Sequence, residues 1–230
     1  MTFNARNFTL GLLKTPTDRD KQHLVGASNL STMCDRCLAD DLLGMPGTES
    51  PYWLGAKIGT AIHTLLEGEA RKFGSDGVLP EQKLILGEIP GYGVVKSTSD
   101  LVVFDEGVAH VTDFKTTKRD KLKMIRRVIN HDDPDPETRF KVNTYLNQLM
   151  LYGMGVQKKF SAPVRDVSLV FICRDGVGDA DVWGYTWDYD PERAQQVWDR
   201  GTNLWAWLQD GGDADTLDSA PGCYTCERER

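Results

Sequence analysis

The chain has 230 residues, of which 40% are hydrophobic and 27% charged, and its formal net charge is −7 at pH 7. This length supports one full hydrophobic core and is too short for two well-formed domains, and the composition is ordinary for a globular protein in water. The negative balance excludes a protein coated in positive charge for indiscriminate DNA binding, but it leaves room for a local basic surface.

The sequence given shows neither a run of apolar residues long enough to span a membrane nor the features of an export signal. The longest apolar runs, such as VSLVFIC at 167–173, are far shorter than the roughly 18 residues that a membrane span needs. The first residues, MTFNARNFTLGLLK, lack the basic start, apolar stretch and cleavage site of a secretory signal. We therefore expect a cytoplasmic protein whose five cysteines are thiols or thiolates rather than disulfides.

Two helical patterns occupy the first third of the chain. Apolar residues at helical spacing predict a helix over 28–43, with Cys34 and Cys37 on its apolar face. A second helix is predicted over about 55–72, and it carries His63 on its side.

Strand patterns dominate the middle of the chain. Alternating side chains predict strands over 83–89, 92–104 and 108–116, with Glu106 and Gly107 as a two-residue hairpin turn between the last two. A helix over 138–155, strands over 166–174 and 181–189, and a helix over 191–208 follow. This order predicts an α/β fold with helices packed on a mixed sheet.

Charged residues on the predicted hairpin indicate a chemical site. Asp113 and Lys115 point to the same face of their strand, and the two-residue turn places Asp100 directly opposite Asp113. A turn one residue longer would reverse that relation. Two adjacent carboxylates repel each other unless a cation lies between them, and hard oxygen ligands suit Mg²⁺ or Mn²⁺. Because a lysine beside such a cation can offset charge on a phosphate, the pattern predicts phosphodiester hydrolysis. The alternative is a solvated hairpin face.

The run STSDLVVFDEGVAHVTDFKT at 97–116 resembles the core of the PD-(D/E)XK nuclease superfamily. The resemblance is strongest to the RecB-like branch, which includes single-domain CRISPR-associated and phage-encoded exonucleases. In that family a helical histidine precedes the hairpin, as His63 does in GTAIHTLLE, and a QxxxY helix follows it, as Gln148 and Tyr152 do in NQLMLYG. The likeness covers nearly the whole chain in order, although Ser99 stands where the name motif has proline.

The resemblance implies a restriction-endonuclease-like α/β core in a single domain over residues 1–230. It implies a metal-dependent DNA exonuclease in phage or mobile-element recombination, repair or replication, in the host cytoplasm if phage-encoded. DNA is the expected partner, together with a recombination or replication protein. A structure-specific endonuclease and a non-cleaving DNA-binding partner are the alternatives.

The resemblance also implies roles for individual residues. It implies that the metal ligands are His63, Asp100, Asp113 and the backbone carbonyl of Phe114. It implies that Lys115 is the catalytic lysine, and that Gln148 and Tyr152 contact DNA or organise the site. By themselves, the histidine could be an ordinary hydrogen-bonded helix residue, and the glutamine and tyrosine a surface pair four residues apart. Glu88, one strand earlier, is expected to be exposed.

Four cysteines form two CxxC pairs, Cys34 with Cys37 and Cys223 with Cys226, the second pair within the tail at 221–230. Each pair is spaced to place two sulfurs on one metal, and this spacing alone favours zinc. The resemblance instead favours a [4Fe-4S] cluster that joins the N-terminal helix to the tail, although related nucleases usually supply one cysteine and three. We expect the [4Fe-4S] cluster, with Zn²⁺ as the alternative and Cys173 as a core residue.

A basic run follows the hairpin. Six cations, with Asp120 as the only acid among them, are expected to contact DNA phosphates without sequence preference: Lys118, Arg119, Lys121, Lys123, Arg126 and Arg127. The alternative is the solvated face of an ordinary helix.

Overall fold

The fold is known from a computed structural model that describes residues 6, 9–10, 13–14, 24–45, 53–73, 76–131 and 135–228. Its centre is one sheet of five strands in the order β1 (Val78–Ile89), β2 (Gly93–Asp105), β3 (Val108–Thr117), β4 (Val164–Cys173) and β5 (Val182–Asp188). Strands β3 and β4 are parallel and the other neighbours are antiparallel. The expected α/β class with a mixed sheet is therefore confirmed.

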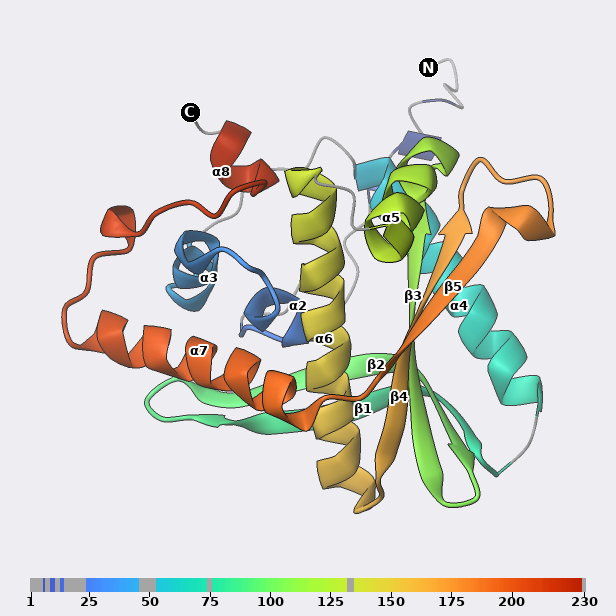
Figure 1. Cartoon of the computed structure of the whole chain (residues 1–230), viewed down its shortest axis with the longest axis horizontal. Coiled ribbons are helices and arrows are strands. Elements are labelled where there is room, and N and C mark those ends of the chain that lie inside the picture. The colour runs from blue at the N-terminus through green and yellow to red at the C-terminus, as the bar shows by residue number, and fades with distance from the viewer. Residues whose placement is uncertain are drawn as a thin grey trace, which may run out of the picture.

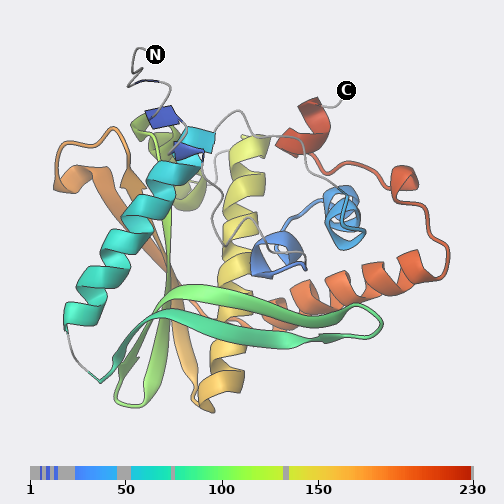
Figure 2. The same ribbon diagram turned by 180° about the vertical axis from the view of Figure 1, so that it is seen from behind.

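Helices cover both faces of this sheet (Figures 1 and 2). They are α2 (Ala27–Leu30), α3 (Asp35–Leu42), α4 (Trp53–Phe73), α5 (Arg119–His131), α6 (Pro136–Phe160), α7 (Pro191–Gln209) and α8 (Tyr224–Arg228), with short 3₁₀ turns η2 (Asp179–Asp181) and η3 (Ala214–Thr216). Helix α4 lies on one face, and α6 crosses the other with α2, α3 and α7 beyond it. No helix among the described segments is both long and apolar enough to span a membrane.

Helix α6 connects the parallel strands and runs through the interior. Asp135 caps its first turn by accepting a hydrogen bond from the backbone N–H of Thr138 at 3.0 Å, and Pro136 occupies the first helical position. Residues 146–156 are all buried, because β1, β4 and α7 pack around the helix. A polar side chain on this part of α6 must therefore find its partner inside the protein.

The hairpin between β2 and β3 has the predicted turn. Glu106 and Gly107 have φ of 49° and 80°, which is the left-handed pair typical of a two-residue hairpin, and Asp105 pairs with Val108. Pairing continues only as far as Leu101 with Thr112. Beyond that point β1 and β2 extend as a long hairpin across α6, away from β3 (Figure 1).

The single helix predicted over 28–43 is wrong, because α2 ends at Leu30 and α3 begins at Asp35. Side chains from later helices donate hydrogen bonds to the backbone carbonyls of the segment between α2 and α3. Arg200 donates to the carbonyls of Leu30 and Thr32, and Asn147 donates to that of Ser31 at 3.2 Å. Since these carbonyls bind side chains instead of continuing the helical ladder, the chain turns and α3 starts afresh.

Candidate active site and metal centre

The candidate active site lies at the fork where β2 and β3 separate. Asp100 is the first residue of β2 beyond the paired segment, and Asp113 follows Thr112, the last paired residue on the β3 side. In place of a strand-to-strand bond, the Asp100 Oδ2 atom accepts a hydrogen bond from the backbone N–H of Phe114 at 2.7 Å. The register therefore agrees with the prediction, and the fork itself fixes the orientation of the Asp100 carboxylate.

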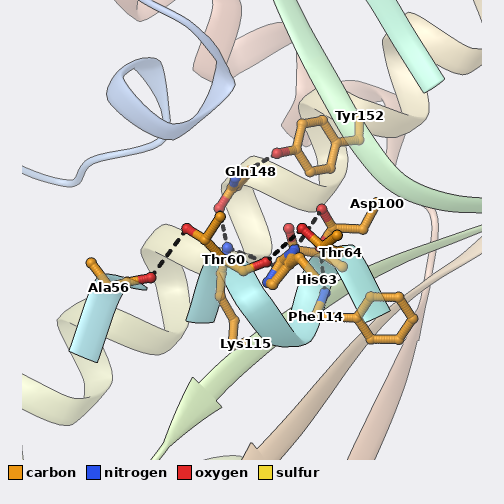
Figure 3. Close-up of polar contacts among 10 residues, drawn as sticks. Ala56, Thr60, His63, Thr64, Asp100, Phe114, Lys115, Gln148 and Tyr152 are labelled. Atoms are coloured by element: carbon orange, nitrogen blue, oxygen red, sulfur yellow. Dashed lines mark hydrogen bonds and ion pairs between the residues drawn. The ribbon is translucent and has the colours of Figure 1, made fainter. Parts of the chain in front are cut away.

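His63 approaches the fork from α4 (Figure 3). Its Nδ1 atom lies 3.2 Å from Asp100 Oδ1, and the two side chains are only 16% and 9% exposed. The Phe114 ring meets the imidazole edge-on, with 6.3 Å between ring centroids. The hydrogen bond with Asp100 raises the pKa of His63, although burial opposes it.

Lys115 lies at the centre of a second group at the same fork. Its Nζ atom is 2.8 Å from Asp113 Oδ2 and donates to Gln148 Oε1 at 3.0 Å. Gln148 Nε2 in turn donates to the Tyr152 hydroxyl at 2.6 Å, so both α6 residues predicted from the QxxxY motif join the network (Figure 3). The ammonium also lies 5.1 Å from the centroid of the Tyr145 ring.

Burial and mutual charge set the ionisation of this network. Asp113 is 2% exposed, and burial together with the Asp100 charge raises its pKa against the influence of Lys115. Burial lowers the pKa of Lys115, but the adjacent Asp113 outweighs it, and the net pKa is raised. Lys115 is therefore a stable ammonium at neutral pH, suited to donate hydrogen bonds and unsuited to act as a base.

The sequence reasoning missed Glu81, which also reaches the fork. Glu81 lies on β1 between the pairs Pro80–Leu101 and Gln82–Ser99, so it faces Asp100 from the side opposite Asp113. Its φ of 50° is rare for a residue with a side chain. The available signal was β-strand alternation, but the predicted strand began at residue 83 and therefore omitted it. Glu88, considered instead, is exposed as expected.

The fork has the donor set for a divalent cation. One ligand atom from each of His63, Glu81 and Asp100 lies within 4.8 Å of the other two. Asp113 Oδ2 is buried and lies 2.8 Å from the Lys115 ammonium. Carboxylate oxygens with one imidazole fit Mg²⁺ or Mn²⁺. Of the predicted ligands, His63 and Asp100 come together, Asp113 faces the lysine, and Phe114 contributes its N–H to the carboxylate of Asp100.

The four paired cysteines meet in a second potential metal centre. One sulfur from each of Cys34, Cys37, Cys223 and Cys226 lies within 4.8 Å of the others, and none of these four residues forms a disulfide. Three of these side chains are buried, and Phe140 and Ala220 pack against the group. The tail reaches this position by running back past α3 (Figure 1). Cys173 lies apart, in the main core at the end of β4, as predicted.

The basic run forms α5, and three of its cations have acidic partners, two of them from outside the helix. Arg119 makes two hydrogen bonds to Asp181 at 2.6 and 2.5 Å, Lys121 lies 3.2 Å from Glu137, and Lys123 lies 3.3 Å from Asp120. These contacts place Arg119, Lys121 and Lys123 in ion pairs. Lys118, Arg126 and Arg127 complete the run and are exposed, as are Lys121 and Lys123. The Arg126 guanidinium lies over the Trp183 ring, 5.7 Å from its centroid.

No family model matches the chain, and no curated protein matches it by sequence. Among solved structures, a "Putative exonuclease" from Eubacterium rectale aligns with a TM-score of 0.51 and 12% identity over 100% of this chain and 94% of that one. The alkaline exonuclease LHK-Exo from Laribacter hongkongensis aligns with a TM-score of 0.49 and 13% identity over 82% and 89% of the two chains. At 12% identity the first likeness shows a shared fold alone.

Proposed function

We propose that this chain is a metal-dependent DNA exonuclease of the RecB-like PD-(D/E)XK type, a single domain over residues 1–230, that hydrolyses phosphodiester bonds at the fork between β2 and β3. The observation that supports this most strongly is the half-buried Lys115 ammonium, which Asp113 and Gln148 hold beside the His63 and Asp100 pair. A partly desolvated ammonium next to carboxylates that can bind a cation costs free energy in a purely structural role, and it is useful in phosphate chemistry.

The residues of the fork would have different roles in hydrolysis. His63, Asp100 and Asp113, with Glu81 adjacent, would hold Mg²⁺ or Mn²⁺, which supplies Lewis acidity and a bound water of lowered pKa. Lys115 would donate to the phosphate or to the attacking water and offset the negative charge on the phosphoryl oxygens in the transition state. Gln148 and Tyr152 position that ammonium, because their hydrogen bonds leave it one orientation.

DNA would approach along α5, which follows β3 almost directly. The exposed cations Lys118, Arg126 and Arg127 can contact phosphates on the way to the fork. Arg119, Lys121 and Lys123 lie in ion pairs, which lowers the charge that they offer to a phosphate. Such contacts are independent of sequence and weaken as salt concentration rises. The biological setting that we propose, phage or mobile-element DNA recombination, repair or replication, rests on the resemblance of the motifs.

The test is digestion of end-labelled linear single-stranded and double-stranded DNA with Mg²⁺ or Mn²⁺. The wild type is compared with Asp113→Asn and Lys115→Met, two substitutions of similar volume that keep the side chains packed. Loss of each charge should lower kcat by about 100-fold or more. Equal rates in all three proteins, each shown to be folded by circular dichroism, would remove the hydrolase proposal.

Closed circular DNA separates the alternatives. An exonuclease leaves it intact, whereas a structure-specific endonuclease cuts it with the same residues. If the protein binds DNA without cutting it, the wild type and both variants should all slow the migration of labelled DNA in a gel, and none of them should degrade it.

A further inference from the structure

The spacing of the four cysteine sulfurs is a feature that an iron-sulfur cluster does not account for. Cys37 Sγ lies 3.4 Å from Cys223 Sγ and 3.5 Å from Cys226 Sγ, and Cys34 Sγ lies 3.7 Å from Cys226 Sγ. The group as a whole falls within 4.8 Å. The distance between two sulfurs depends on the size of the metal group that they bind. It is therefore shorter around a single ion than around an iron-sulfur cluster.

One ion with four thiolates at about 2.3 Å in tetrahedral geometry places its sulfurs roughly 3.8 Å apart. In a [4Fe-4S] cluster each iron takes one thiolate at the outside of a cube, so the thiolates lie on the order of 6 Å apart. The observed separations match the first arrangement and are too short for the second. The [4Fe-4S] cluster that the resemblance implied therefore does not fit these four side chains.

We propose that Cys34, Cys37, Cys223 and Cys226 bind a single tetrahedral zinc ion. Four thiolates with no open position make a closed structural site, and zinc is the usual occupant of paired CxxC units. The distribution of two cysteines from each end of the chain agrees with this arrangement. The site is independent of the proposed hydrolysis, because it lies outside the fork and shares no residue with it.

The surroundings of the site fit a compact, negatively charged metal complex. The backbone N–H of Ala220 donates to Cys34 Sγ at 3.5 Å. Thiolate sulfur is both the better acceptor of such a bond and the form of cysteine that binds a metal. A divalent cation at the centre of the group would offset the charge of four neighbouring thiolates.

Space around the sulfurs is also limited. Cys34, Cys223 and Cys226 are 0%, 3% and 8% exposed, and Phe140 packs against them. Arg200 fixes the segment before Cys34 by binding the carbonyls of Leu30 and Thr32. An expansion to cluster dimensions would have to displace this packed segment.

The experiment measures the metal content of protein purified anaerobically from cells supplied with both iron and zinc. We expect about one zinc per chain, less than about 0.1 iron, and no visible absorption. Replacement of zinc by Co²⁺ should give the intense visible bands of a tetrahedral thiolate site. About four irons with a broad brown absorption, a single iron, or no metal at all would each overturn the proposal.

Variants connect the metal to these residues. Cys37→Ser, the partly exposed member of the group, should lower zinc content at least about tenfold. Cys173→Ser is the matched control, because it removes a thiol outside the group, and it should keep one zinc. If Cys37→Ser does not fold, the Co²⁺ spectrum of the wild type still decides the proposal, and metal content is read without any measurement of nuclease activity.

Discussion

At the scale of the residue, the molecule depends on a few buried polar groups whose partners are all supplied by the fold. Gln148 is the clearest example, since its oxygen accepts from Lys115 while its nitrogen donates to Tyr152. It is 7% exposed, so neither bond can be replaced readily by bulk water. Removal of one partner from such a network leaves the other buried and unsatisfied, which costs more than the bond contributed.

Substitution of Gln148 should therefore lower the free energy of unfolding, and it should also lower the rate of catalysis in the fraction that is folded. We expect Gln148→Leu to lower kcat for linear DNA about tenfold or more with little change in KM, because the ammonium loses its orientation while DNA contacts remain. Tyr152→Phe, which removes only the outer bond, should have a smaller effect. Steady-state kinetics on labelled DNA measures both, and a wild-type kcat in Gln148→Leu would contradict the positioning role.

Gly222 is a second residue whose role is fixed locally. Its φ is +79°, and a Cβ atom there would lie 2.5 Å from the carbonyl oxygen of Pro136. Gly211 is a matched control, because its φ is +91° with nothing within 4 Å of the added Cβ. We expect Gly211→Ala to lower the free energy of unfolding by about 1 kcal/mol, and Gly222→Ala to lower it by more. Urea denaturation measures both, and equal losses would argue against the close packing of the tail.

At the scale of the element, helix α5 is attached to the segment before β5. Arg119 binds Asp181 through two nitrogens, and Asp181 also accepts from the backbone N–H groups of Val177 and Gly178. The basic run therefore begins with a structural anchor. Cations that hold the fold together are less free to bind a phosphate than cations that face solvent.

The anchor predicts a pH dependence of stability. The hydrogen bond with Arg119 lowers the pKa of Asp181 in the folded state, so its contribution is present above the unfolded value of about 3.9 and is lost as pH falls through the folded value. The difference in urea midpoint between wild type and Asp181→Asn should be constant from about pH 7 to 5 and shrink on further acidification. A difference that stays constant down to pH 2.5 would contradict this assignment.

Helix α5 also predicts which cations bind DNA. In an Asp113→Asn background, where DNA is not cut, Arg126→Ala and Arg127→Ala should each reduce the slope of log affinity against log salt by about 1. Lys123→Ala, which removes a cation paired with Asp120, is the control and should change the slope less. Fluorescence anisotropy with labelled DNA measures the slope for each variant. If the slopes of all three variants equal that of the parent protein, DNA does not bind along α5.

At the scale of the whole molecule, a metal ion on the four cysteines would close most of the chain into one loop. Cys34 and Cys226 are 192 residues apart in sequence, so a metal bound by both would remove much conformational freedom from the unfolded chain. Metal affinity then becomes folding free energy. The centre also fixes α3 and the tail beside the end of α6 that begins at Pro136.

Metal removal should therefore loosen the whole protein. Cross-links of long loops contribute about 2–4 kcal/mol, and 1 kcal/mol shifts Tm by about 2–4 °C at this size, so chelation or Cys37→Ser should lower Tm by roughly 5–15 °C. Calorimetry measures the shift in Tm. The control is Cys173→Ser, whose Tm should still fall when the chelator is added, because its four metal-binding cysteines are intact. An unchanged Tm after complete metal loss would show that the centre does not support the fold.

The sequence by itself determined the features that depend on neighbouring residues. Alternation predicted the strands, and the Glu106–Gly107 turn set the hairpin register, whose last pair, Leu101 with Thr112, directly adjoins Asp100 and Asp113. Helical periodicity predicted α4, α6 and α7 within a few residues of their ends. Such features follow from backbone geometry over a few residues, which the local sequence specifies.

Only the tertiary structure decided the features that depend on distant partners. Arg200 and Asn147 divide the helix predicted over 28–43, the pairing of β1 with β2 brings Glu81 to the fork, and Asp181 neutralises Arg119. The sulfur separations that favour one ion over a cluster likewise arise where the two ends of the chain meet. In each case the competing bond comes from a residue tens of positions away, which no local pattern encodes.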